Sequence, residues 1–112
     1  QVKASQRAIV ITEQLVPTEI IRREPERTVI PGFRVSHVVH LPFAAHPTSV
    51  YRAYDYDADQ IRRYVDASQT REGFQAYLDK YVYGAGDHWA YLELVGGLRH
   101  LTGLAADPIL GY

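Results

Sequence analysis

The sequence lacks cysteine and methionine entirely. Without cysteine, disulfide bonds, thiolate metal sites and cysteine nucleophiles are all excluded. No apolar run approaches the roughly 20 residues of a membrane-spanning helix, and no basic segment followed by an apolar one opens the chain. We therefore expect a soluble, cytoplasmic protein with no membrane partner. Because residue 1 is glutamine and no methionine is present, we also expect the 112 residues to belong to a longer polypeptide.

The chain also has no large excess of positive or negative charge. Twelve Lys and Arg stand against thirteen Asp and Glu, which gives a net charge of −1. This balance offers nothing that would attract a nucleic acid, so we predict no nucleic-acid partner. What the chain has is an ordinary globular composition, with 46% hydrophobic and 22% charged residues and no low-complexity tract.

The first part of the chain reads as strands, within about residues 7–41. The run RAIVIT at 7–12 is continuous, apolar and β-branched, as in a strand buried on both faces of an α/β sheet. Two further strands are predicted at 28–30 and 33–41, on either side of a Pro-Gly turn. A short helix is expected to begin at Pro17, which is tolerated in a first helical turn.

The second part reads as three helices, within about residues 57–104. Asp57 can cap the first helix, with Gln60 three residues later as in a capping box. Thr70 can cap an amphipathic second helix, and a third begins at Asp87. We predict a single α/β segment over residues 1–112, with strands first and then three helices.

Histidines near the middle of the chain raise the question of a metal site, since imidazole is the commonest metal ligand. His37 and His40 would point to opposite faces of a regular strand and cannot share one ion. A set of His40, His46 and Asp55 would require the following loop to fold back. We favour hydrogen-bonded histidines and predict no metal site.

Ser49 and His46 also suggest a nucleophile and its base. A catalytic pair of this kind needs a third group that orients the imidazole, and the sequence shows no recognisable carboxylate in that role. Asp57 and Asp59 are explained as a helix cap and a first-turn charge. We therefore expect Ser49 to shape a turn, and serine hydrolysis is disfavoured. No glycine-rich phosphate-binding loop is present.

Two stretches taken in order carry a resemblance to a known family: VITEQLVPTEIIRREPERTVIPGFRVSHVVHLPFAAHPTSVYRAYDYD and YLDKYVYGAGDHWAYLELVGG. They resemble the C-terminal part of the alpha subunit of a CoA-transferase, in the family of the glutaconate CoA-transferase alpha subunit. The resemblance spans about residues 7–97. It implies a Rossmann-like layered α/β fold of the NagB/RpiA/CoA-transferase-like type, and a hetero-oligomer with a beta subunit.

The resemblance also implies an activity for the whole heteromer. CoA would pass from an acyl-CoA to a free carboxylic acid through a glutamyl-CoA thioester, with CoA as a substrate and no permanently bound cofactor. The nucleophilic glutamate is expected on the beta subunit, so no catalytic residue is expected in this chain, and Glu13 and Glu19 are read as structural. The family loop matching FAAHPTS usually has glycine where Ala44 stands. His46 and Ser49 match this loop and become candidate substrate-pocket or subunit-interface residues.

Two alternatives stay open at this point. One is a hydrolase of the same fold, acting on CoA esters or ring-cleavage products. The other is a non-catalytic assembly module that docks a partner through the helix around 74–82 and the tyrosines at 51, 54 and 56. Whether the 112-residue chain alone is an enzyme also stays open, and we expect it to lack transferase activity by itself.

Overall fold

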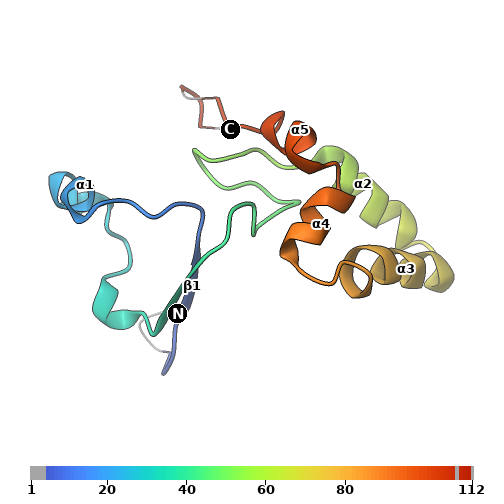
Figure 1. Ribbon diagram of the computed structural model, residues 1–112, viewed down its shortest axis with the longest axis horizontal. Helices are drawn as coiled ribbons and strands as arrows, with labels where there is room; N and C mark the ends of the chain where they lie inside the picture. Colours follow the sequence, from blue (N-terminus) through green and yellow to red (C-terminus); the bar gives the residue numbers. More distant parts are fainter. Residues whose placement is uncertain (1–4, 108, 112) are drawn as a thin grey trace. The chain divides into compact units, whose positions relative to one another are not determined.

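The computed structural model describes residues 5–107 and 109–111, and the chain divides into two compact units, Gln1–Ala44 and Ala45–Tyr112. Figure 1 follows the elements from β1 near the N-terminus to α5 near the C-terminus. Among the described residues, no helix is long and apolar enough to cross a membrane.

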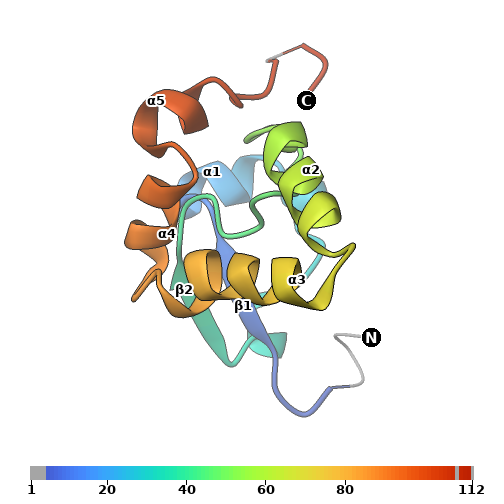
Figure 2. The ribbon, with the colours of Figure 1, turned by 90° about the vertical axis from the view of Figure 1, so that its right-hand side faces the viewer.

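The first unit is built on a pair of parallel strands, β1 (Ile9–Thr12) and β2 (His37–His40). Ile9 lies opposite His37 and Thr12 opposite His40, and Figure 2 shows the strands side by side. Parallel strands need a crossover connection. Here the connection contains α1 (Thr18–Arg23) and two short 3-10 turns, Pro25–Arg27 and Gly32–Arg34.

Two of the strand predictions were wrong in detail. Residues 28–30 form no strand, and the strand predicted at 33–41 is limited to His37–His40. Proline explains this result, because it cannot donate a ladder hydrogen bond. Pro25 begins one 3-10 turn, and Pro31 precedes the other.

The strands of this unit present apolar side chains to solvent. Ile9 and Ile11 in β1 are exposed, as are Val38 and Val39 in β2. The sequence predicts that the first strand is covered on both faces, and the described residues of the first unit do not supply that cover. The unit therefore contains the strands of an α/β sheet without most of its core.

The second unit is helical, and its helices begin at capping residues. They are α2 (Ala58–Ala67), α3 (Arg71–Leu78), a π-helical turn (Asp79–Tyr83), α4 (His88–Leu94) and α5 (Gly97–Thr102). Asp57 accepts a hydrogen bond from Gln60 N–H at 2.9 Å, and Thr70 accepts one from Gly73 N–H at 3.0 Å. Asp87 likewise accepts from Ala90 N–H at 2.8 Å. The three predicted helix starts are confirmed.

A separate short helix, α5, follows the third predicted helix. Gly96 and Gly97 have φ of 132° and 65°, values that side chains rarely adopt, so the chain turns sharply between α4 and α5. This turn points α5 back toward the rest of the unit and brings Leu101 into the core, where it is buried with Leu92 and Val95. The turn also determines where His100 lies.

The helices pack around aromatic side chains. Tyr64 of α2 makes edge-to-face contacts with Phe74 and Tyr77 of α3, with centroids 5.8 Å and 5.5 Å apart. Tyr77 in turn lies 4.7 Å from Tyr81, which is buried. Aromatic contacts of this kind add to the burial of apolar area, so they hold α2 against α3.

Candidate functional site: a buried carboxylate between two histidines

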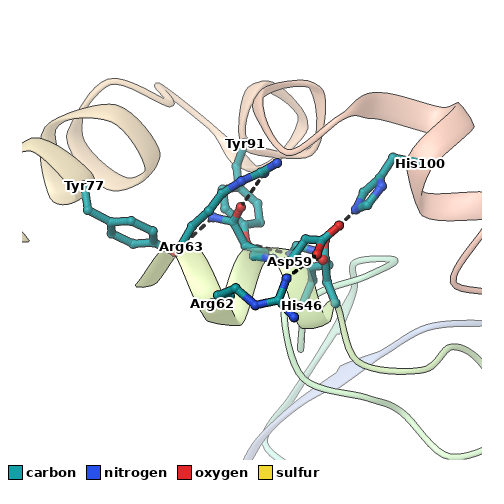
Figure 3. A network of polar contacts seen from close by, with 9 residues as sticks. His46, Asp59, Arg62, Arg63, Tyr77, Tyr91 and His100 are labelled. Atoms are coloured by element: carbon teal, nitrogen blue, oxygen red, sulfur yellow. Dashed lines mark hydrogen bonds and ion pairs between the residues drawn. The ribbon is translucent and has the colours of Figure 1, made fainter. Parts of the chain in front are cut away.

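Asp57 lies at the centre of a group of polar side chains inside the second unit. Its Oδ2 accepts hydrogen bonds from His46 Nε2 at 3.0 Å and from His100 Nε2 at 2.5 Å. The other ring nitrogen of His46, Nδ1, lies 2.7 Å from the Tyr91 hydroxyl. Figure 3 shows His46, Tyr91 and His100 converging on this point. We call Asp57, His46, His100 and Tyr91 the Asp57 cluster.

The members of the cluster come from separate parts of the chain. His46 lies in the loop before α2, Asp57 is the residue that caps α2, Tyr91 is in α4 and His100 is in α5. Asp57 and His46 are 2% and 8% exposed, whereas the His100 side chain is 32% exposed. The cluster is therefore closed on the side of His46 and open to solvent on the side of His100.

Asp57 is ionised at neutral pH. Burial by itself raises the pKa of this carboxyl group, but hydrogen bonds from His100, from Gln60 N–H and from His46 favour the charged form. The hydrogen bonds prevail and lower the pKa of Asp57 from 3.8 to about 2. A buried carboxylate is costly unless it is paired, and these donors provide the pairing.

His46 is neutral at neutral pH. Burial lowers its pKa below 6.5, and this outweighs the hydrogen bond and the charge of Asp57, which raise it. Because Nε2 faces the carboxylate, the single ring proton is assigned to Nε2. Nδ1 then accepts the Tyr91 O–H, whose pKa is raised by burial so that the hydroxyl keeps its proton.

A second set of polar contacts extends from Gln60, which is fully buried. The Gln60 side-chain amide donates to the Tyr77 hydroxyl at 3.0 Å, and its carbonyl oxygen accepts from Arg63 at 3.2 Å. Asp59 and Arg62, which also belong to α2, form an exposed ion pair at 3.2 Å (Figure 3). The buried and the exposed carboxylates of this helix start thus differ sharply, which provides a matched pair for mutagenesis.

The cluster also contains a donor set that metal ions use. One ligand atom each from His46, Asp57 and His100 lies within 4.8 Å of the others. Two imidazoles and a carboxylate can bind zinc or ferrous iron. However, among the described residues every buried side-chain nitrogen and oxygen already has a hydrogen-bond partner. Hydrogen bonds alone satisfy the cluster, and the absence of a metal site stays a prediction.

The two residues that the sequence singled out, His46 and Ser49, have different surroundings. Both ring nitrogens of His46 are engaged, by Asp57 and by Tyr91, and Ser49 is partly buried further along the same loop. The sequence argument that no carboxylate orients His46 was wrong, because Asp57 does so. A Ser49–His46 nucleophile stays disfavoured, now because the imidazole faces other partners.

His40 and Asp55, two members of the alternative metal set, each have hydrogen-bond partners within their own unit. His40 Nε2 lies 3.2 Å from the Glu13 carbonyl oxygen, and the Asp55 carboxylate accepts from Tyr56 N–H at 2.7 Å. His37 is exposed in β2. These groups have local hydrogen-bonding roles or lie at the surface, as the interpretation of ordinary histidines expects.

Sequence reasoning missed Tyr91 and His100 and saw only half of the role of Asp57. The cap was recognised because it joins residues three apart, Asp57 and Gln60. The contacts of His46 with Tyr91 and of Asp57 with His100 span 45 and 43 residues. No periodicity or short motif reports contacts over that separation.

Comparison with known proteins gives a consistent picture, although no family model matches the chain. The chain is 39% identical to the A subunit of glutaconate CoA-transferase from Acidaminococcus fermentans, over 98% of its own length and 34% of the relative's. It is 47% identical to an uncharacterized protein of Archaeoglobus fulgidus, over 91% of the chain and 23% of that protein. It is also 29% identical to the A subunit of 3-oxoadipate CoA-transferase from Pseudomonas knackmussii, over 75% of the chain and 29% of the relative.

A comparison with solved structures agrees with these sequence similarities. The crystal structure of glutaconate coenzyme A-transferase from Acidaminococcus fermentans matches with a TM-score of 0.90 and 38% identity, covering 99% of this chain and 35% of that one. The chain belongs to the family of the glutaconate CoA-transferase alpha subunit, so the resemblance is confirmed. The α/β fold expected from it is confirmed as well. The chain spans about a third or less of the length of the curated relatives that it matches.

Proposed function

We propose that the chain is part of the alpha subunit of a CoA-transferase, which moves CoA from an acyl-CoA to a carboxylic acid. The similarity to the A subunit of glutaconate CoA-transferase, 39% identity over 98% of the chain, carries this proposal. The proposal includes a hetero-oligomer with a beta subunit, CoA in the role of substrate rather than resident cofactor, and a cytoplasmic location. The chain would correspond to the C-terminal part of its subunit.

The chemistry of the proposed reaction needs a carboxylate nucleophile that accepts the acyl group and then CoA, with water excluded. We assign this nucleophile to a glutamate of the beta subunit. The state of Asp57 supports that assignment, because both of its oxygens are occupied by hydrogen-bond donors inside the second unit. Glu13 is similarly engaged in the first unit, where its Oε2 accepts from Phe43 N–H at 2.6 Å.

We propose that His46 and Ser49 belong to a loop that lines the substrate pocket or the subunit boundary. The two residues would contribute differently. The His46 side chain is fully shielded from solvent and engaged on both nitrogens, which suits holding the loop in shape. Ser49 is partly exposed and has the hydroxyl group that could contact a substrate or a partner.

The test is to express the longer polypeptide together with its beta-type partner, and to measure the transfer of CoA between two carboxylic acids. We expect transfer by the assembled protein and none by the 112-residue chain alone. Loss of the thioester without an acceptor acid would instead favour the hydrolase alternative. An assembled protein that neither transfers CoA nor cleaves the thioester would contradict the proposed function and favour an assembly module.

A further inference from the structure

The segment from Pro47 to Asp57 is a closed loop whose two ends meet. Asp57 N–H donates to the Pro47 carbonyl oxygen at 2.9 Å. Tyr54 fills the loop: it is 2% exposed, and its hydroxyl accepts from Ala45 N–H at 3.0 Å. Compact loops of about 6 to 16 residues that are packed by their own side chains are frequently functional. Ser49 lies within this loop.

Asp57 is the point at which the loop is attached to the helices. Its Oδ1 accepts from Gln60 N–H in α2, and its Oδ2 accepts from His46 before the loop and from His100 in α5. Tyr91 in α4 binds the other side of the His46 ring. A single carboxylate therefore connects the base of the loop to two helices directly and to a third through His46.

We propose that Asp57 and His100 are positioning residues of this enzyme, which hold the His46 ring and with it the closed loop that carries Ser49 in one orientation. The inference rests on the proposed function. Hydrogen bonds to a charged group are strong, and in a poorly solvated interior they are stronger still. The middle of the loop is held separately, by a bridge between Val50 and Tyr54 and by backbone hydrogen bonds to residues 104–106. The Asp57 contacts hold its base against the helices, and with it the His46 ring.

Asp57→Asn isolates this role because it changes few atoms. The amide oxygen can still accept from Gln60 N–H, so the cap of α2 is kept. The amide nitrogen then takes the place of Oδ2 and faces the N–H donors of His46 and His100, where two donors cannot pair. Asp59→Asn is the matched control, since Asp59 lies on the same turn with its side chain 66% exposed.

The experiment measures kcat and KM of the assembled enzyme for both acids. We expect Asp57→Asn to lower kcat/KM roughly 100-fold, the size of effect that a displacement of about 1 Å can have, and Asp59→Asn to leave it unchanged. His100→Leu should lower it as well, whereas His100→Gln should recover part of the loss, because the glutamine amide can donate to Oδ2.

A spectroscopic measurement separates this inference from the proposed function. In the 112-residue chain, nitrogen-15 chemical shifts should show His46 protonated on Nε2 alone, and Asp57→Asn should abolish that single tautomer. If the assembled wild type transfers no CoA, the proposed function fails, and these shifts still report whether Asp57 holds His46. A mixture of His46 tautomers in the wild type would overturn the inference.

Three kinetic outcomes would also overturn it. In the first, Asp57→Asn and His100→Leu keep kcat/KM within about twofold of Asp59→Asn. In the second, they reduce only the yield of assembled enzyme, with kcat and KM unchanged. In the third, a metal ion is bound stoichiometrically and its removal by a chelator mimics the variants. If Asp57→Asn does not fold, the comparison of His100→Leu with His100→Gln decides, since His100 is partly exposed.

Discussion

The two units of the chain differ in which side chains they expose and which they bury. The first unit has a parallel strand pair whose isoleucines and valines are exposed. The second buries an ionised carboxylate, a histidine and a glutamine among its helices and satisfies them by hydrogen bonds. The comparison teaches that the second unit has a core of its own, whereas the first needs further apolar surface to complete a sheet.

The largest effect is expected in the core of the second unit. Leu101→Ala should lower the free energy of unfolding by about 2–5 kcal/mol, because Leu101 is 3% exposed and its removal leaves a cavity. Leu98→Ala on the same helix is the control and should change it by less than about 0.5 kcal/mol, since Leu98 is 74% exposed. Urea titrations of both variants measure this; equal effects would contradict a core at α5.

Acid should weaken the second unit through Asp57. The pKa of this group falls from 3.8 to about 2 on folding, so its contribution of about 2 kcal/mol is present above about pH 4 and is lost as the pH falls toward 2. The difference in unfolding free energy between the wild type and Asp57→Asn should therefore shrink over this range. Denaturant titrations from pH 5 to pH 2 measure it, and a difference that stays constant over this range would contradict the lowered pKa of Asp57.

His46 should cause a second, milder loss of stability on acidification, which begins at a higher pH than the loss caused by Asp57. Its folded pKa is lowered, so the unfolded chain binds a proton near pH 6.5 before the folded chain does. Stability should fall as the pH drops below about 6.5, with a slope of at most about 1.4 kcal/mol per pH unit from this one proton. His46→Gln should remove this slope in denaturant titrations, and His37→Gln should keep it. A slope unchanged in His46→Gln would assign the proton to another group.

The smallest effect is expected in the first unit. Ile11→Thr should change the unfolding free energy of the 112-residue chain by no more than about 0.5 kcal/mol, because Ile11 is 55% exposed. In the full-length subunit that we propose, where we expect this strand to be covered, the same substitution should lower the unfolding free energy considerably more. Melting curves of both forms test this, and a large loss in the short chain would show that β1 is already buried.

A structural feature could be predicted from the sequence when the residues that form it lie close together along the chain. The starts of α2, α3 and α4 were predictable, because a cap joins residues three apart, as Thr70 and Gly73 show. The strand predicted at 28–30 failed because proline-led 3-10 turns on either side leave no regular ladder. Propensity alone favoured a strand there.

The candidate site was predictable only in part. His46 stood out through the family loop and Asp57 through its position before a helix. Their connection to His100 depends on the turn at Gly96 and Gly97, which redirects α5. That connection is a property of the packed unit, and no local pattern in the sequence contains it.

Hydrogen exchange resolved by residue tests the contrast between the units most directly. In the 112-residue chain, the backbone amides of Asp57 and Gln60, which donate to Pro47 and to the Asp57 side chain, should exchange far more slowly than the amides of β1 and β2. Asp57→Asn should speed the exchange of the backbone amide of residue 57 and leave the exchange rates of the strand amides unchanged. Strand amides protected as well as those around Asp57 would contradict the account.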